Sequence, residues 1–449
     1  MSGFLLKTVE LIGHNLITSG VVIFLGIIAI SISRRWWKSH AAKKLFQKSL
    51  AAGTFPNLYP EVDHSLCGGC GTCVSACPEG EILRLINHKS TLVQPMKCIG
   101  HGACERACPR KAIRLVYGSK ERGVDIPRIS ANFETNVPGL YIAGELGGMG
   151  LINNAIKQGH LAAKHAIETL DNSKSNSAEF DLCIIGAGPA GFAAALTAIA
   201  KRRKYILLEQ GTFGGTVANY PKQKLVMTAP VDLPLAGKIA FNGNKVTKEQ
   251  LMHTWKNIAN TAKLRIVEKT TFSGVEPKEG GFKVKTSKGD ISARKVILAL
   301  GLRGSPRKLD IANEDIPKVT YSLSDAKDYV HRDIAVVGAG NSAVEAAYSL
   351  SDPKLANRVT LIVRKGEFSR CKEENVANIQ AREKQRLVRI MYNSQISSVD
   401  DSTVEISQQG KKVSLPNNFL FVLIGAEMPF DFLRNLGIII DKKYGEPVE

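Results

Sequence analysis

Seven of the nine cysteines in this 449-residue chain fall between Cys67 and Cys108, which is too crowded for the disulfides of a secreted domain. The first four, followed at once by a proline, form the pattern C-x2-C-x2-C-x3-C-P: Cys67, Cys70, Cys73 and Cys77. Thiolates are soft ligands that suit iron, and the short spacing lets three of them surround one iron–sulfur cluster. A zinc site is the alternative, but it needs only four ligands and rarely has this spacing. The pattern therefore favours iron–sulfur clusters in a reducing compartment.

A second cysteine series begins at Cys98 and repeats the spacing, except that His101 stands where the second cysteine belongs. This is the spacing of a bacterial two-cluster ferredoxin, in which the fourth cysteine of each series binds the other cluster. By that pattern one cluster is held by Cys67, Cys70, Cys73 and Cys108, and the other by Cys77, Cys98, Cys104 and His101. A neutral imidazole ligand would raise the potential of its cluster. Alternatively, His101 does not ligate, and the site holds a three-iron cluster or a cluster with a water-bound corner.

A nucleotide-binding element begins near residue 181, where a predicted strand runs into a glycine turn and then a helix. The turn residues are Gly186, Gly188, Pro189, Ala190 and Gly191. Such glycines let a pyrophosphate approach the backbone at a helix N-terminus. The next strand, YILLE, ends at Glu209, where an acid accepts a hydrogen bond from an adenosine ribose, and Gln210 follows. Strand, turn, helix, strand and acid in register predict a dinucleotide-binding domain.

A second turn of the same kind follows the predicted strand Asp333–Val337 and contains Gly338, Gly340, Asn341 and Ser342. The next strand, RVTLIV, ends without a carboxylate and is followed by Arg364, Lys365 and Arg370. An acid at this position selects the 2′-hydroxyl of NADH, whereas cations suit the 2′-phosphate of NADPH. We therefore predict a nicotinamide domain that prefers NADPH to NADH, with solvated surface charges as the alternative explanation.

From residue 121 to its end, the chain resembles the low-molecular-weight thioredoxin reductase family and its ferredoxin–NADP reductase relatives. The similar segments are GAGPAG from Gly186, GGT at 214–216, LALGLRGSPRKL at 298–309, GAGNSAVEAA from Gly338, VRKGEFSR at 363–370, FLFVLIGAEMP at 419–429 and NVPGLYIAGELGGMGLINNAIKQG at 136–159. The resemblance implies an α/β fold with two Rossmann-like domains, one for FAD and one for NAD(P)H. It implies an FAD site that includes Gly215, Thr216, Gly144 and Glu145, the last at a position where the family usually has Asp. It also implies that a hydride passes from the nicotinamide to the flavin, with no side-chain acid or base required.

The order of these segments departs from the family, which places the GLYIAGE strand and the helix after it last. Here they precede the first glycine turn, as in a circular permutation joined through the polar linker 171–178. The permutation predicts that residues 140–143 share a sheet with residues 181–185, that Glu145 faces the Gly186 turn, and that the chain near Gly445 ends beside residues 121–129. A domain swap in an obligate homodimer would place these contacts between chains, and an undocked duplication would abolish them.

The family's C-x-x-C dithiol is also missing, because the corresponding stretch, VTYSLSDAKDYVHRD, has no cysteine. Of the two cysteines outside the cluster motif, Cys183 is predicted to be buried in a strand and Cys371 to be an isolated cysteine of a surface loop. We therefore expect the clusters, which carry single electrons, to replace the dithiol as the exit for electrons.

An apolar run without charged residues, residues 15–33, precedes the cluster motif. As a helix it would be about 28 Å long, close to the roughly 30 Å of a bilayer core, and the sequence RRWWK follows it as an interfacial collar. A signal peptide or a buried core helix is the alternative, but a signal peptide carries its positive charge before the apolar run. We therefore predict a single-pass anchor in the cell membrane, with the C-terminal domains in the cytoplasm by the positive-inside rule.

The net charge of +19 is scattered along the chain rather than gathered in a basic block. It favours membrane lipid, phosphorylated cofactors and an acidic electron-transfer protein or membrane redox partner over nucleic acid.

The predicted domains follow one another along the chain. An anchor at 1–38 and a juxtamembrane linker at 39–60 precede an α+β two-cluster ferredoxin domain at 61–118. The FAD domain is made of three parts, at 119–170, 179–310 and 426–449, with a linker at 171–178 and the NAD(P) domain at 311–425 between them. The predicted function is electron transfer between NAD(P)H, FAD, two 4Fe-4S clusters and a further redox partner. The alternatives are the reverse reaction, which reduces NADP from a ferredoxin, and a non-enzymatic iron–sulfur sensor.

Overall fold

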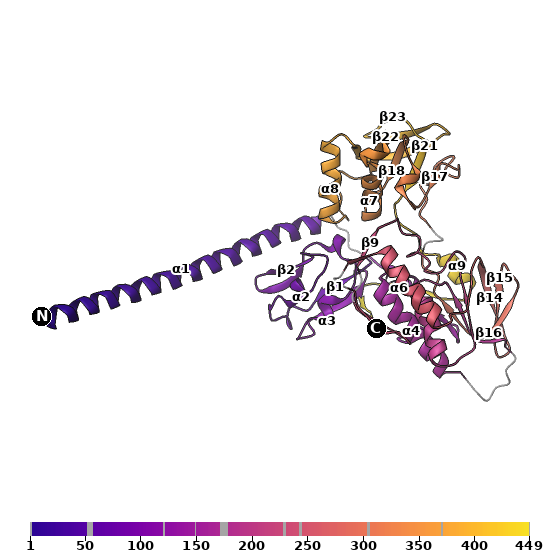
Figure 1. The fold of residues 1–449 in the computed structure, drawn as a ribbon, viewed down its shortest axis with the longest axis horizontal. Coiled ribbons are helices and arrows are strands. Elements are labelled where there is room, and N and C mark those ends of the chain that lie inside the picture. The colour runs from indigo at the N-terminus through magenta and orange to yellow at the C-terminus, as the bar shows by residue number, and fades with distance from the viewer. Residues whose placement is uncertain are drawn as a thin grey trace. The chain divides into compact units, whose positions relative to one another are not determined.

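The computed structural model describes residues 2–51, 57–119, 122–148, 150–170, 178–227, 230–241, 245–302, 306–369 and 371–448 (Figure 1). In the first helix, side chains are described from residue 23 to residue 47. The chain divides into two compact units, residues 1–116 and residues 117–447.

Helix α1 (Ser2–Ala51) runs without a break through the apolar run and through Arg34, Arg35 and Lys38 after it (indigo in Figure 1). Its C-terminal part packs on the cysteine-rich part of the same unit, where Ala42 is fully buried. A bilayer-spanning helix needs about 20 consecutive apolar residues. Within the described part of the chain, no helix is both long enough and apolar enough to meet that requirement. The predicted single-pass anchor and cell-membrane location are therefore wrong. The membrane-lipid partner, which the net charge of +19 also suggested, stays a prediction.

The cysteine-rich part is built from short elements: β1 (Leu58–Val62), α2 (Thr72–Ser75), β2 (Leu83–Ile86), β3 (Lys89–Leu92), η1 (Pro95–Lys97), α3 (Ala103–Arg106) and β4 (Ile113–Tyr117). Strand β1 pairs with β4, and β2 pairs with β3 as an antiparallel hairpin. Helices α2 and α3 each follow a left-handed glycine, Gly71 and Gly102, so the two cysteine series have the same local fold. A small core holds two cysteines, Cys73 and Cys104, beside Leu83 and Ile113.

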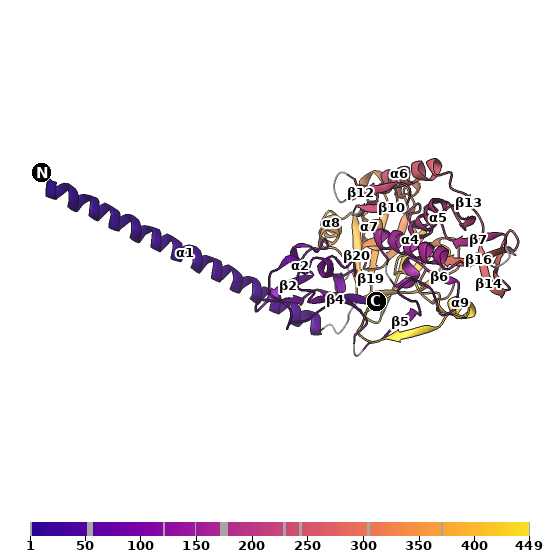
Figure 2. The same cartoon turned by 90° about the horizontal axis from the view of Figure 1, so that it is seen from below.

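The second unit contains a seven-stranded sheet in the order β13 (Ile266–Val267), β8 (Tyr205–Leu208), β7 (Phe180–Ile185), β16 (Ile291–Leu298), β15 (Gly281–Thr286) and β14 (Phe272–Lys278), with β6 (Leu140–Ile142) paired to β16. Strands β6, β16, β7, β8 and β13 run parallel. Their side chains form near-continuous apolar runs, as expected of strands buried on both faces. Helices α4 (Ile152–Glu168) and α5 (Pro189–Ala200) lie side by side against this sheet (Figure 2).

Strand pairing confirms the docking that the permutation predicts. Leu140 in β6 is in register with Val296 in β16, and Cys183 in β7 is in register with the same residue on the other side. Strand β25 (Ile440–Lys443) pairs antiparallel with β5 (Val124–Pro127). All these contacts form within one chain, so the chain completes its own sheet and needs no domain swap.

A second parallel sheet has the order β17 (Val319–Thr320), β24 (Phe419–Val422), β18 (Asp333–Val337), β19 (Arg358–Val363) and β20 (Val388–Tyr392). Helices α7 (Asn341–Leu350) and α8 (Glu373–Lys384) accompany it, and an antiparallel sheet of β21 (Ser394–Val399), β22 (Thr403–Gln408) and β23 (Lys411–Pro416) follows β20. The other elements are η2 (Glu145–Gly147), β9 (Leu225–Met227), β10 (Val231–Leu233), β11 (Gly237–Ile239), β12 (Lys245–Thr247), α6 (Lys248–Thr261), η3 (Ala326–Asp328), η4 (Pro353–Leu355), α9 (Phe430–Asn435) and β26 (Glu446–Pro447).

Candidate functional site

The first glycine turn joins β7 to α5 and leaves no room for side chains on its inner side. Gly186 has a φ of +100°, which favours glycine, and a Cβ there would lie 2.4 Å from the carbonyl oxygen of Ala299. A Cβ on Gly191 would lie 1.8 Å from the carbonyl oxygen of Gly186, so only glycine lets α5 approach the strand this closely. At Gly188, in contrast, a Cβ would meet open space. The turn thus leaves the N-terminus of α5 accessible to an anionic ligand.

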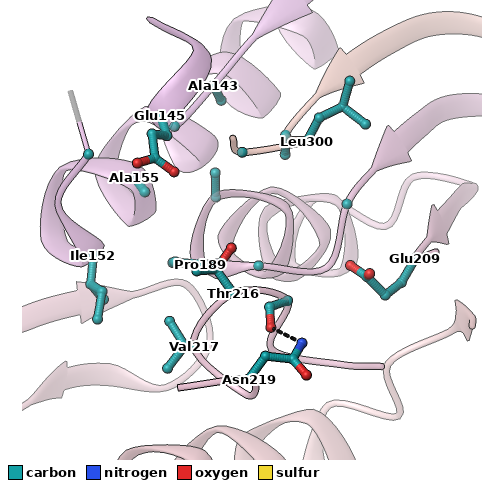
Figure 3. Close-up of a pocket in the computed structure, with 18 of the residues that line it drawn as sticks. Ala143, Glu145, Ile152, Ala155, Pro189, Glu209, Thr216, Val217, Asn219 and Leu300 are labelled. Carbon is teal, nitrogen blue, oxygen red and sulfur yellow. Dashed lines mark hydrogen bonds between the residues drawn. The ribbon is translucent and has the colours of Figure 1, made fainter. Parts of the chain in front are cut away.

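A cavity of about 450 Å³ lies against this turn (Figure 3). Of the residues predicted to bind FAD, only Gly191 does not line the cavity, because it packs behind the turn. The others all line it: Gly144, Glu145, Gly186, Gly188, Pro189, Ala190, Glu209, Gln210, Gly215 and Thr216. The walls come from the ends of β6, β7, β8 and β16, that is, from the carboxyl ends of parallel strands. Its volume is in the range of cofactor pockets.

Glu209 is held in place by backbone groups at the end of β8. Its side chain is buried, one carboxylate oxygen accepts from the N–H of Ala187 at 2.8 Å, and the other accepts from the N–H of Gly211 at 2.8 Å. Glu145 and Glu209 lie at opposite ends of the cavity in Figure 3. Each carboxylate oxygen of Glu209 has a second lone pair, so the side chain can still accept a hydrogen bond from a ribose hydroxyl.

The N-terminal part of helix α4 lines the cavity, and two of its residues that were not predicted, Gln158 and Gly159, support this wall. The buried side chain of Gln158 accepts a hydrogen bond from the N–H of Gly144 at 2.8 Å. A Cβ on Gly159 would lie 2.0 Å from the carbonyl oxygen of Ala190, so α4 touches the first turn of α5. The only signal for this contact is the row of small residues at 155, 159, 162, 163 and 166, which marks a close helix–helix interface but not its partner.

Glu145 lies at the other end of the cavity from Glu209. Two further lining residues, Tyr220 and Asn219, were missed by sequence reasoning. Burial raises the pKa of the Glu145 carboxyl, and a hydrogen bond from the N–H of Leu302 offsets part of that effect. Burial also raises the pKa of Tyr220, and the nearby charge of Glu145 adds to the increase. The Asn219 amide donates to the carbonyl oxygen of Gly215 at 2.9 Å, drawn dashed in Figure 3, and so fixes the loop that carries Thr216.

The second glycine turn has the same arrangement of its first two glycines, but the side chain after them is engaged elsewhere. A Cβ on Gly338 would lie 2.5 Å from the carbonyl oxygen of Leu423, whereas at Gly340 it would meet open space. Ser342 is exposed, but the side-chain oxygen of Asn341 accepts from the N–H of Lys372 at 2.9 Å and from the Asn375 amide at 3.0 Å. The side chains of Arg364 and Lys365 are exposed just beyond the end of β19. Arg370, predicted to join them, lies outside the described residues.

The two isolated cysteines are both buried. Cys183 in β7 is fully buried, as predicted. Cys371 is only 1% exposed and donates from Sγ to the side-chain oxygen of Asn341 at 3.3 Å, so the prediction of a surface-loop cysteine is wrong. The segment after β19 folds back under α7, which the sequence pattern does not show.

The first set of cluster cysteines surrounds one small cavity. It is lined by Cys67, Cys70, Cys73 and Cys108, the grouping expected from the ferredoxin pattern. The N–H of Ala112 lies 3.2 Å from Cys108 Sγ, and the N–H of Ser90 lies 3.4 Å from Cys67 Sγ. Backbone donors of this kind stabilise the charge on ligating thiolates.

The second set of cysteines is more deeply buried. Burial raises the pKa of Cys98 to about 11 and that of Cys104 to about 12, and the charges of neighbouring motif cysteines, including Cys77 for both, add to the increase. Burial lowers the pKa of His101, and its Nε2 atom is buried without a hydrogen-bond partner. A neutral imidazole with one unpartnered nitrogen fits a metal ligand. Among the described residues, no three Cys, His, Asp or Glu side chains are arranged to hold a single metal ion.

Two family profiles match the chain and together account for these sites. The profile of pyridine nucleotide-disulphide oxidoreductases matches residues 183–448, and that of the 4Fe-4S dicluster domain matches residues 59–109. The chain belongs to the pyridine nucleotide-disulphide oxidoreductase family. The matched family segment starts in β7, so residues 119–170, which complete the first sheet from the N-terminal side, lie outside it.

Relatives of the chain are named for different activities. Bacilliredoxin reductase Bdr of Bacillus subtilis is 26% identical over 270 residues, which cover 59% of this chain and 82% of that protein. Ferredoxin–NADP reductase of Ignicoccus hospitalis is 25% identical over 270 residues, which cover 58% of this chain and 81% of that protein. The structure of bacillithiol disulfide reductase Bdr (YpdA) from Bacillus cereus has a TM-score of 0.53 at 23% identity, covering 60% of this chain and 85% of that one, and it shows the shared fold.

The family and the second profile establish an FAD-dependent oxidoreductase with an iron–sulfur domain, whose cofactors are FAD, NAD(P)H and 4Fe-4S clusters. The residues present fit these groups. The cavity at the first turn has side-chain-free backbone at Gly188 where a pyrophosphate needs it, and Cys67, Cys70, Cys73 and Cys108 converge on one space.

Proposed function

We propose that this protein passes electrons between a nicotinamide nucleotide and its two iron–sulfur clusters through FAD, and from the clusters to a further redox partner. The observation that carries the proposal is the pairing of a complete flavin cavity with two cysteine sets in a chain that has no C-x-x-C dithiol outside the cluster motif. FAD accepts an electron pair as hydride and releases electrons singly, which is the form that clusters carry.

The residues of the chain bind and orient these groups. The Gly186 turn and the N-terminus of α5 receive the pyrophosphate, and Glu209 accepts from the adenosine ribose. The end of the cavity lined by Glu145, Thr216 and Tyr220 receives the rest of FAD. The first cluster is held by Cys67, Cys70, Cys73 and Cys108, and the second by Cys77, Cys98, Cys104 and the Nε2 atom of His101.

The nucleotide at the second turn is NADPH rather than NADH. Gly338 and Gly340 admit the pyrophosphate, while Arg364 and Lys365 supply positive charge just after β19, whose last residues include no carboxylate. The net charge of +19 suits an acidic electron-transfer protein as the final partner.

The test is a stoichiometric reductive titration of anaerobically purified protein. We expect NADPH to bleach the flavin absorbance, and the clusters to become paramagnetic within the same titration. In a Cys73→Ala/Cys104→Ala variant, the flavin should still bleach while the cluster signals are lost. A wild-type protein whose flavin is fully reduced while both clusters stay oxidised, even with excess NADPH, would rule out the proposed electron path.

A further inference from the structure

Two hydroxyl side chains contact sulfur atoms of the first cysteine set. The Oγ atom of Ser90 lies 3.1 Å from Cys73 Sγ, and the Oγ1 atom of Thr72 lies 3.3 Å from Cys70 Sγ. A cysteine that ligates iron is a thiolate and has no proton to give. In both contacts the hydroxyl is therefore the donor and the sulfur is the acceptor.

Ser90 has the stronger position of the two. It is 1% exposed, whereas Thr72 is an exposed residue. Its backbone N–H also points to the first set, 3.4 Å from Cys67 Sγ. One residue that is not itself a ligand thus contacts two ligand sulfurs of the same cluster.

The β2–β3 hairpin fixes Ser90 in this place. Its two turn residues, Asn87 and His88, have φ of 50° and 60°, which is the conformation of a tight two-residue hairpin turn. The carbonyl oxygen of His88 lies so close to the cysteine loop that a Cβ on Gly69 would meet it at 2.1 Å. His64 Nε2 is bonded to the carbonyl oxygen of Ser90 at 2.9 Å. The hairpin therefore packs against the loop, and the Ser90 hydroxyl cannot easily turn away.

The repeated series offers a direct comparison. Gly71, Thr72 and Cys73 of the first series correspond to Gly102, Ala103 and Cys104 of the second, so the position of the Thr72 hydroxyl carries only a methyl group there. Lys89, next to Ser90, adds a positive charge near the first set, because its Nζ donates to the carbonyl oxygen of Cys67 at 2.7 Å.

We propose that Ser90 is a positioning residue that raises the reduction potential of the cluster held by Cys67, Cys70, Cys73 and Cys108. Reduction adds one electron to the cluster, and hydrogen bonds to its sulfurs strengthen as their negative charge grows, so donors favour the reduced form. Thr72 contributes less, because water competes for an exposed hydroxyl. The proposal requires loaded clusters only, and it holds whichever way electrons flow between the clusters and the nucleotide.

The test is a redox titration of the full chain, followed by the paramagnetic signal of each reduced cluster, with externally supplied electrons. Ser90→Ala removes the hydroxyl and keeps the backbone N–H. We expect a roughly fivefold shift of one cluster's equilibrium toward the oxidised form, which at 59 mV per tenfold is a potential lower by about 40 mV. Thr72→Val should shift the same cluster in the same direction by a smaller amount.

Three comparisons keep the result specific, each made at equal iron and flavin content. Ser90→Thr retains a hydroxyl and should stay near the wild-type potential. Ser394→Ala removes another buried hydroxyl, from β21 of the other unit, and should change neither cluster. In a His101→Cys background, Ser90→Ala should shift the cluster that His101→Cys leaves unchanged. Three outcomes would overturn the proposal. The first is an equal shift of both clusters in Ser90→Ala, and the second is an unchanged potential in both Ser90→Ala and Thr72→Val. The third is a Ser90→Thr shift as large as that of Ser90→Ala.

Discussion

The two glycine turns of the chain share a sequence pattern but differ in how tightly they are packed. In the first, the third small residue is Gly191, and a Cβ there would lie 1.8 Å from the carbonyl oxygen of Gly186. In the second turn, the corresponding residue is Ala343, so a methyl group is accommodated at this position. It occupies the space beside Gly338, where a hypothetical Cβ on Gly338 would lie 2.7 Å from the Ala343 methyl carbon. The first helix therefore approaches its strand more closely than the second does.

The first turn is also more enclosed by the rest of the structure than the second turn is. The first turn faces a cavity whose walls come from β6, α4, β8 and β16, so segments far apart in the sequence enclose the ligand. At the second turn, Ser342, Arg364 and Lys365 are exposed. An enclosed site suits a cofactor that stays bound, and an open one suits a nucleotide that must leave after each turnover. The shared glycine pattern thus indicates a dinucleotide, while the packing around it separates the resident cofactor from the substrate.

The largest effect should come from adding one methyl group to the first turn. Gly191→Ala forces α5 away from β7, and we expect a loss of about 3 kcal/mol in the free energy of unfolding together with most of the bound flavin. Gly340→Ala places its methyl in open space and should cost no more than about 0.5 kcal/mol. Flavin-to-protein ratios and thermal unfolding would measure both. If Gly191→Ala kept full flavin and the wild-type Tm, the proposed difference in packing would be wrong.

A smaller loss should follow from damage to the α4 wall. Gln158→Leu leaves the buried N–H of Gly144 without its acceptor, at a cost of about 1–3 kcal/mol. Because Gly144 lines the cavity, we expect FAD affinity to fall by roughly tenfold or more. Lys157→Leu changes a neighbouring exposed position of the same helix and is the control. Equal FAD dissociation constants for the two variants would show that Gln158 does not support the site.

The sequence predicted those parts of the sites that depend on local pattern. Strand–turn–helix order located both glycine turns, cysteine spacing grouped Cys67, Cys70 and Cys73 with Cys108, and the order of segments located β6 in the first sheet. Each of these depends on residues that lie close in sequence or on the need of a parallel sheet for a buried strand.

Contacts between distant segments could not be predicted in the same way. Gln158 looked like an ordinary helix residue, because its acceptor role depends on where the N–H of Gly144 comes to lie. Asn341 was expected to face the nucleotide, yet its side-chain oxygen is bonded to Lys372 and Asn375. The apolar run at 15–33 met a compositional rule for a membrane helix, but it forms part of one longer helix that continues through charged residues.

Nucleotide preference provides a test of the open site. Replacing Arg364 and Lys365 together with alanine should raise KM for NADPH by roughly three- to tenfold, because exposed ion pairs contribute about 0.2–1 kcal/mol each. KM for NADH should change little, since it has no 2′-phosphate. Arg386→Ala removes an exposed cation from elsewhere in the same domain and is the control. Equal changes for both nucleotides would mean that Arg364 and Lys365 act on structure rather than on the phosphate.

The smallest expected effect is a pH dependence at the enclosed site. Burial raises the pKa of the Glu145 carboxyl above its usual value of 4.5, so flavin-free folded protein binds this proton more tightly than the unfolded chain does. The stability associated with Glu145 is therefore fully present below the unfolded pKa and is lost as pH rises through the folded pKa.

Glu145→Gln removes this charge. The variant's free energy of unfolding, relative to that of wild type, should rise as the pH is increased from 4 to 7, because only wild type must then bury a carboxylate. Asp401→Asn, at an exposed carboxylate, should show no such rise. Thermal unfolding of the flavin-free proteins across this range would measure the difference. Parallel pH profiles for Glu145→Gln and wild type would contradict a partly desolvated carboxyl at this end of the cavity. The site would then differ from the second turn in its packing but not in its electrostatics.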